Sequence, residues 1–131
     1  MLRFALAVPM IVHGLAHLAG FVAAWTPAQT GFTDNPWIIS AGVTLKNPLG
    51  RVFGLLWTLA VLGLVGAGLG IVFSQAWWPG LAIAGAAVSL LVILPWWNTV
   101  VPGAKVGALF DLLTLAALLL PWSSRLINLF P

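Results

Sequence analysis

Residues 49–73, LGRVFGLLWTLAVLGLVGAGLGIVF, decide the fold of this chain. Apart from Arg51 near its start, the stretch carries no charged side chain. A helix needs roughly 20 mostly apolar residues to cross the ~30 Å hydrocarbon core of a bilayer. Because the backbone must satisfy its own hydrogen bonds in lipid, a span of this length and composition is a helix. The stretch therefore predicts a transmembrane helix.

Three further stretches are long and apolar enough to span a bilayer, at about residues 2–25, 77–97 and 104–121. Tryptophans gather at the predicted helix ends, as in an interfacial aromatic belt: Trp25, Trp77, Trp78, Trp96, Trp97 and Trp122. The links at 74–76 and 98–103 are short, which makes successive helices antiparallel neighbours. We therefore expect one all-α domain over residues 1–131, a four-helix transmembrane bundle running up, down, up and down.

The connection between the first two spans, residues 26–48, is long for a loop and is apolar in its middle. It carries Trp37, Ile38 and Ile39, which do not suit a solvated loop, so we expect a lid over one mouth of the bundle. The tail at 123–131 places Arg125 among apolar residues and is expected to lie in the membrane interface.

The composition of the whole chain agrees with a surface that faces lipid. Of its 131 residues 62% are hydrophobic and 5% are charged, whereas a soluble domain carries about 25% charged residues. The five Lys and Arg residues form no basic stripe that would follow phosphates, which excludes a nucleic-acid partner. The absence of Cys excludes disulfides, thiolate nucleophiles and Cys-type zinc sites.

Small residues at four-residue spacing predict where the helices approach one another. Gly66 and Gly70 have this spacing in the second span, and Gly85 and Ser89 have it in the third. Such pairs serve either internal helix contacts or a homo-oligomer or larger membrane complex. Internal contacts are the more common use in a chain with four helices.

Ionisable side chains inside a membrane are costly and usually functional. His13 and His17 of the first span are four residues apart and share one helix face, which continues as small residues. Counting ~1.5 Å per residue from the predicted helix ends places His17, Trp57 and Asp111 in one layer. His13 then lies one turn deeper and Arg51 lies above. These five side chains predict a pocket that opens to one side of the bundle.

Several interpretations of this cluster remain open. An Asp–His hydrogen bond can do no more than fix the register of two helices. The same groups can line a pocket for a quinone, haem, pigment or other lipophile. The set His13, His17 and Asp111 also permits a metal site with two His and one carboxylate. No convincing nucleophile accompanies the cluster, so the sequence favours a protein without catalytic activity.

The first two spans also carry a family resemblance. Residues 13–18, HGLAHL, resemble the His-Gly-x-x-Lys-Leu signature of DoxX-like small membrane proteins, with His17 at the Lys position. An HGxxHLxGF opening at 13–21 and an RxxGLLW segment at 51–57 are similar to uncharacterised bacterial four-helix membrane proteins. The resemblance implies a location in the bacterial inner membrane and a membrane subunit of a redox or quinone-linked system.

The sequence thus predicts a small integral membrane subunit or binding module with an intramembrane pocket for a lipophilic ligand. Two alternatives remain, a quinone- or haem-linked redox membrane subunit and a purely structural accessory subunit of a larger membrane complex. The expected ligand-binding residues are His13, His17, Trp57, Asp111 and Arg51.

Overall fold

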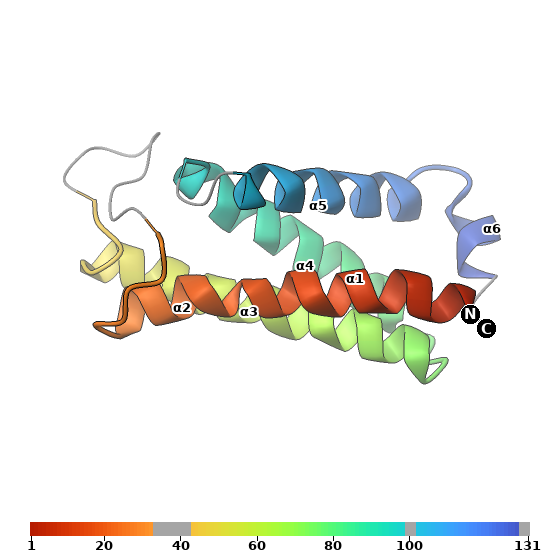
Figure 1. The fold of residues 1–131 in the computed structure, drawn as a ribbon. Coiled ribbons are helices and arrows are strands. Elements are labelled where there is room, and N and C mark those ends of the chain that lie inside the picture. The colour runs from red at the N-terminus through yellow and green to blue at the C-terminus, as the bar shows by residue number, and fades with distance from the viewer. Residues whose placement is uncertain (33–42, 99–101, 129–131) are drawn as a thin grey trace.

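The computed structural model describes residues 1–32, 43–98 and 102–128. All regular secondary structure in these residues is helical. The elements in chain order are α1 (Leu2–Ala16), α2 (Leu18–Trp25), α3 (Pro48–Val72), α4 (Trp78–Ile93), η1 (Leu94–Trp96), α5 (Gly103–Leu119) and α6 (Ser123–Ile127). Figure 1 shows the α1–α2 segment, α3 and α5 running roughly along one direction, α4 crossing them obliquely, and successive segments alternating in sense.

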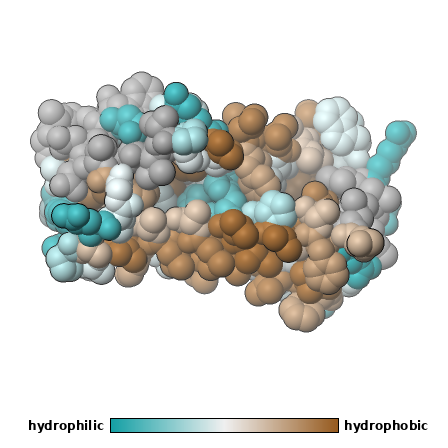
Figure 2. Space-filling model, viewed as in Figure 1, coloured by the Kyte–Doolittle hydropathy of each residue, from teal (hydrophilic) through white to brown (hydrophobic). Residues whose placement is uncertain are grey.

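Within the described residues, three helical segments are long and apolar enough to cross a membrane: Arg3–Trp25, Pro48–Val72 and Trp78–Trp96. The chain is therefore an integral membrane protein by the length and composition of its helices. Helix α5 has 17 residues and is slightly shorter than these three. Large apolar side chains remain exposed along the outer faces of the helices, and they form a hydrophobic surface in Figure 2.

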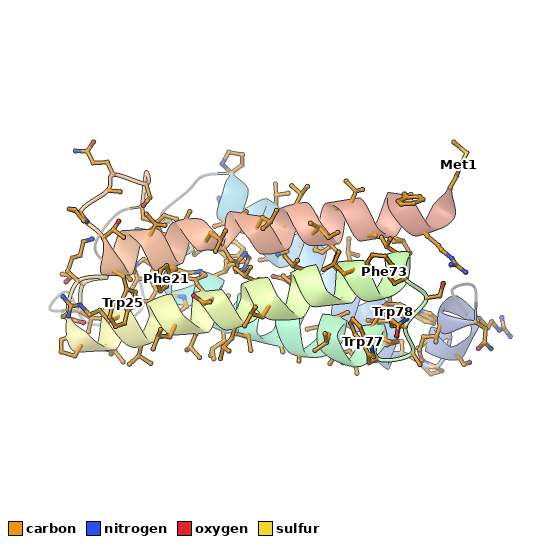
Figure 3. All side chains as sticks on the ribbon, turned by 90° about the horizontal axis from the view of Figure 1, so that it is seen from below. Met1, Phe21, Trp25, Phe73, Trp77 and Trp78 are labelled. Carbon is orange, nitrogen blue, oxygen red and sulfur yellow. The ribbon has the colours of Figure 1, made fainter. Side chains whose placement is uncertain are left out.

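Aromatic side chains mark both ends of the long helices. Figure 3 shows Phe21 and Trp25 towards one end of the molecule, and Phe73, Trp77 and Trp78 at the opposite end, close to the amino terminus. Trp25 and Trp77 are each about half exposed. This distribution is typical of a protein whose ends lie at the two membrane–water interfaces.

The helices pack in an order that leaves α1 and α5 on either side of a hollow. Helices α1 and α2 both lie on α3, α3 packs along α4, and α5 packs mainly on α4. Helix α3 approaches α4 closely where Gly63 meets Gly85. A Cβ atom on Gly63 would lie only 2.7 Å from Cα of Gly85, so a larger residue would not fit there. On the other side of α3, a Cβ atom on Gly68 would lie 2.5 Å from the Ile11 side chain of α1. These glycines serve contacts within the chain.

The first membrane span is divided into two helices at His17. The amide of His17 donates to the carbonyl of Gly14 over 3.1 Å, and the amide of Gly20 donates to the carbonyl of His17 over 3.0 Å. These bonds join residues three apart, so the helix tightens locally before it continues as α2. The predicted helical span over residues 2–25 is confirmed as Arg3–Trp25, and the tightened turn at His17 divides it into α1 and α2.

The two described ends of the long connection are held by polar contacts. The ammonium group of Lys46 donates to the carbonyls of Ala23 and Thr26, which are acceptors at the carboxyl end of α2. The side chain of Asn47 caps α3 by accepting from the amide of Gly50 over 2.9 Å. The residues on which the predicted lid depends, Trp37, Ile38 and Ile39, lie outside the described residues.

The buried interior has a polar layer between two apolar clusters. One cluster lies towards the amino terminus and includes Ala7, Met10, Leu64, Ala67, Ile71, Trp78, Ala82, Ala86 and Leu118. The other lies towards the long connection and consists of Ala23, Leu45, Trp57, Val92 and Trp96. His17, Ser89 and Asp111 are the buried polar side chains among the described residues, and His17 and Ser89 fall between these clusters along their own parts of the chain.

Candidate ligand pocket beside a buried polar network

Four polar side chains from three helices meet in the middle of the molecule. His13 comes from α1, His17 from the junction of α1 and α2, Ser89 from α4 and Asp111 from α5. Ser89 and Asp111 are fully buried, and His17 is 5% exposed. The network joins α5 to the α1–α2 segment across the hollow between them.

Hydrogen bonds link the four side chains into one network. Nε2 of His13 lies 3.0 Å from Oδ1 of Asp111, and the Ser89 hydroxyl bonds the other oxygen, Oδ2. Nε2 of His17 lies 2.6 Å from Oγ of Ser89, and Nδ1 of His17 lies 3.0 Å from the carbonyl oxygen of His13. Nε2 of His13 also approaches Oγ of Ser89 at 3.4 Å. Apart from Nδ1 of His13, the side-chain polar atoms of the network are therefore paired with one another or with the backbone.

Two arrangements of protons satisfy these bonds when His13 is neutral. The carbonyl of His13 can only accept, so Nδ1 of His17 must donate. In the first arrangement a doubly protonated His17 donates to Ser89, and Ser89 donates to an ionised Asp111. In the second arrangement a protonated Asp111 donates to Ser89, and Ser89 donates to a neutral His17. The two arrangements differ by one proton passed along Ser89, and neither leaves a net charge inside the membrane.

His13 has the same role in both arrangements, since its Nε2–H donates to Oδ1 of Asp111. The other edge of its ring faces Gly107, where a Cβ atom would lie 2.8 Å from Cε1 and 3.5 Å from Nδ1 of His13. Phe110 lies beside the same ring, with centroids 5.1 Å apart. Gly107 thus leaves room for the imidazole between α1 and α5.

A pocket with a volume of about 390 Å³ adjoins this network. Its lining comes from α1, α2, α3, the end of α4, η1, the start of α5 and the described start of the first loop. The lining residues are His13, Ala16, His17, Ala19, Thr30, Phe32, Trp57, Ile93, Trp96, Gly103, Ala104 and Gly107. Figure 2 shows hydrophilic atoms in a hollow midway along the hydrophobic face, where α5 and the α1–α2 segment face each other in Figure 1. The volume falls within the range of ~300–1,000 Å³ that is usual for small-molecule sites.

Aromatic side chains form one wall of the pocket. The Trp57 ring contacts Phe32 and Trp96 edge to face, with centroids 5.4 Å apart in both pairs. Gly20 admits the Trp57 indole against α2, because a Cβ atom on this glycine would lie 2.2 Å from the ring. The lining also includes small residues from α1, α2 and α5. A lining that combines aromatic rings with small residues suits a ring-shaped ligand.

The structure separates the residues that the sequence grouped together. His13, His17 and Trp57 line the pocket, whereas Asp111 lies buried behind His13 and is not part of the lining. Arg51 is outside the pocket, on the exposed side of α3, with its guanidinium group 5.6 Å from the centre of the Trp25 ring. The depth estimate placed His17 in the layer of Asp111, but the direct partner of Asp111 is His13. The estimate counted residues from the predicted helix ends. An error of one helical turn in those ends is enough to place His17, and not His13, at the level of Asp111.

Ser89 is the member of the network that the sequence did not single out. In the sequence, Ser89 is a small residue four positions after Gly85, and this spacing is typical of a contact between helices. A second signal was available, because Ser89 is a hydroxyl residue in the middle of an otherwise apolar span. A serine at that depth needs a partner on its own backbone or on another helix.

A metal site built from His13, His17 and Asp111 finds no support in the geometry. Among the residues that the structure describes, no three His, Cys, Asp or Glu side chains converge as metal ligands. Both ring nitrogens of His17 are engaged in hydrogen bonds, to Ser89 and to the carbonyl of His13. His17 therefore has no lone pair to offer a metal without breaking the network.

Comparisons of the chain with protein-family models, with curated proteins and with solved structures found no match, so the interpretation of the pocket rests on its own residues.

Proposed function

We propose that this chain is a small integral membrane binding module that holds a lipophilic ligand in the pocket between the α1–α2 segment and α5. In this proposal α5 crosses the bilayer with the other three segments, which gives a four-helix bundle in a bacterial inner membrane. The observation that carries the proposal is a largely apolar pocket of ligand size that adjoins a buried polar network.

The depth of the pocket supports a ligand that arrives from the lipid. His13 lies about 18 Å along the helix from Trp25 and about 17 Å from Leu2, at ~1.5 Å per residue. The His13 end of the pocket is thus near the middle of a ~30 Å hydrocarbon layer, and the lining continues from there towards the first loop. A polar network that only fixed helix register would need no adjoining cavity.

A redox subunit that binds a quinone is the second candidate. The aromatic wall of Phe32, Trp57 and Trp96 beside an imidazole favours it, since a quinone has a flat ring with polar substituents. Haem is less suited to this site, because the ring nitrogens of His17 and Nε2 of His13 already take part in hydrogen bonds.

The test is to identify what the protein carries out of native membranes. Detergent-purified protein is extracted with organic solvent, the extract is analysed by mass spectrometry, and an absorbance spectrum is recorded before extraction. We expect one lipophile at near-stoichiometric amount. A Soret band would instead assign haem, and the absence of any enriched lipophile would leave the structural accessory role.

A matched pair of variants separates the pocket from the rest of the surface. Ala16 lines the pocket, whereas its neighbour Leu15 is 48% exposed and lies outside the lining. Ala16→Phe places a ring in the pocket and is expected to abolish co-purification, while Leu15→Phe changes only the lipid-facing surface. Equal retention of the lipophile by both variants would place its binding elsewhere.

A further inference from the structure

The hydrogen bonds of His13 determine which ring nitrogen faces the pocket. Its Nε2 donates to Oδ1 of Asp111 in both proton arrangements described above. If Asp111 donated to His13 instead, Ser89 would have to donate to the other carboxyl oxygen and His17 would need two protons. That alternative leaves a buried cation without an anion, which is costly inside a membrane. When His13 is neutral, its proton is therefore on Nε2, and Nδ1 carries a lone pair.

The lone pair on Nδ1 lies at the pocket. Among the residues that the structure describes, Nδ1 of His13 has no hydrogen-bond partner. The Nδ1–Cε1 edge of the ring faces Gly107, which itself lines the pocket, and the His13 side chain keeps 13% of its surface accessible. The other imidazole of the lining, His17, has both nitrogens engaged. The deep end of the pocket thus offers a hydrogen-bond acceptor.

We propose that the pocket selects lipophiles whose ring carries a hydroxyl group, which are phenols in the broad sense, and that Nδ1 of His13 accepts the hydrogen bond from this hydroxyl. This inference rests on the proposed binding function and specifies its ligand class. The ring lies against the aromatic wall of Trp57 and Trp96, and the hydroxyl points towards α1. Among quinone-type molecules, the reduced hydroquinone has such a donor and the oxidised quinone does not.

The experiment compares two probes that differ in one hydrogen-bond donor. The phenol probe is 4-propylphenol, and the control probe is its methyl ether, 4-propylanisole, which has a similar shape. Their dissociation constants are measured by equilibrium dialysis against the full-length protein in detergent micelles, for the wild type, His13→Phe and Leu15→Phe. The two probes partition differently into detergent, but this difference is the same for every variant. It therefore cancels when the ether-to-phenol ratio of dissociation constants is compared between variants.

We expect the ether-to-phenol ratio of dissociation constants to be about tenfold higher in the wild type than in His13→Phe, as one hydrogen bond provides. Leu15→Phe is expected to keep the wild-type ratio. Equal ratios in the wild type and His13→Phe, with both probes bound, would overturn the phenol inference and leave the pocket intact. Failure of the wild type to bind either probe would overturn the inference together with the proposed function.

A measurement on the unmodified protein covers the case in which His13→Phe does not fold. The chain contains two histidines, so protein labelled with ¹⁵N-histidine gives four ring-nitrogen signals. Adding 4-propylphenol is expected to shift the signal of the unprotonated Nδ1 of His13, because that nitrogen accepts a hydrogen bond. 4-Propylanisole is expected to leave this signal in place. The same response to both probes, or a protonated Nδ1 in the free protein, would contradict the proposal.

Discussion

Ser89 occupies the position where the hydrogen bonds from α1, α4 and α5 meet. Its single hydroxyl bonds Asp111 and His17 and also lies near Nε2 of His13. A longer side chain would separate the imidazoles from the carboxyl group, and alanine would leave two buried polar groups without partners. The network therefore depends on a small hydroxyl residue at this position.

Asp111→Asn tests which proton arrangement the network adopts. An asparagine can accept from Nε2 of His13 and donate to Ser89, which reproduces the arrangement with a neutral His17. We expect the free energy of unfolding in micelles to fall by about 1 kcal/mol or less. Asp111→Leu, which has a similar volume, deprives His13 and Ser89 of their partner and is expected to cost about 1–3 kcal/mol. Equal losses for both variants would show that the network requires the ionised carboxyl group.

At the scale of elements, sequence patterns predict the bounds of the helices better than they predict which side chains of different helices form hydrogen bonds. The predicted ranges follow the observed helices closely, because length, apolar composition and terminal tryptophans act locally along the chain. The interruption at His17 has no such local mark, since no glycine or proline stands at that position. The pairing of Asp111 with His13 depends on how far α1 and α5 slide past each other, which hydropathy does not encode.

The close approach of α3 and α4 gives a prediction at the same scale. A Cβ atom on Gly85 would lie 2.8 Å from the amide nitrogen of Leu64, so Gly85→Ala must push the two backbones apart. We expect this variant to lose about 1–3 kcal/mol of unfolding free energy. Gly80→Ala is the control in the same helix, because a Cβ atom there meets nothing within 4 Å. A loss in Gly80→Ala as large as that in Gly85→Ala would contradict the role of the glycine contact.

For the whole molecule, the alternation of helix direction predicts where each connection lies. The turn between α3 and α4 lies at the amino-terminal end, and the described start of the first loop lies at the opposite end, as Figure 1 shows. The wild type contains no Cys, so single cysteines at Gln75 and Ala28 are the only thiols in their variants. With sealed vesicles of uniform orientation, a membrane-impermeant maleimide is expected to label one variant from outside and the other only after lysis. Labelling of both variants from outside would contradict a spanning arrangement.

The hydrophilic hollow in Figure 2 lies on the side of the molecule, midway along its hydrophobic face. If the proposed binding function holds, a lipophile reaches this hollow by diffusing within the leaflets, without first passing through the aqueous phase. Saturation then depends on the number of solute molecules per lipid and not on their concentration in the buffer. Apparent affinities that differ between lipid-rich and lipid-poor preparations become comparable once they are expressed as mole fractions in the bilayer.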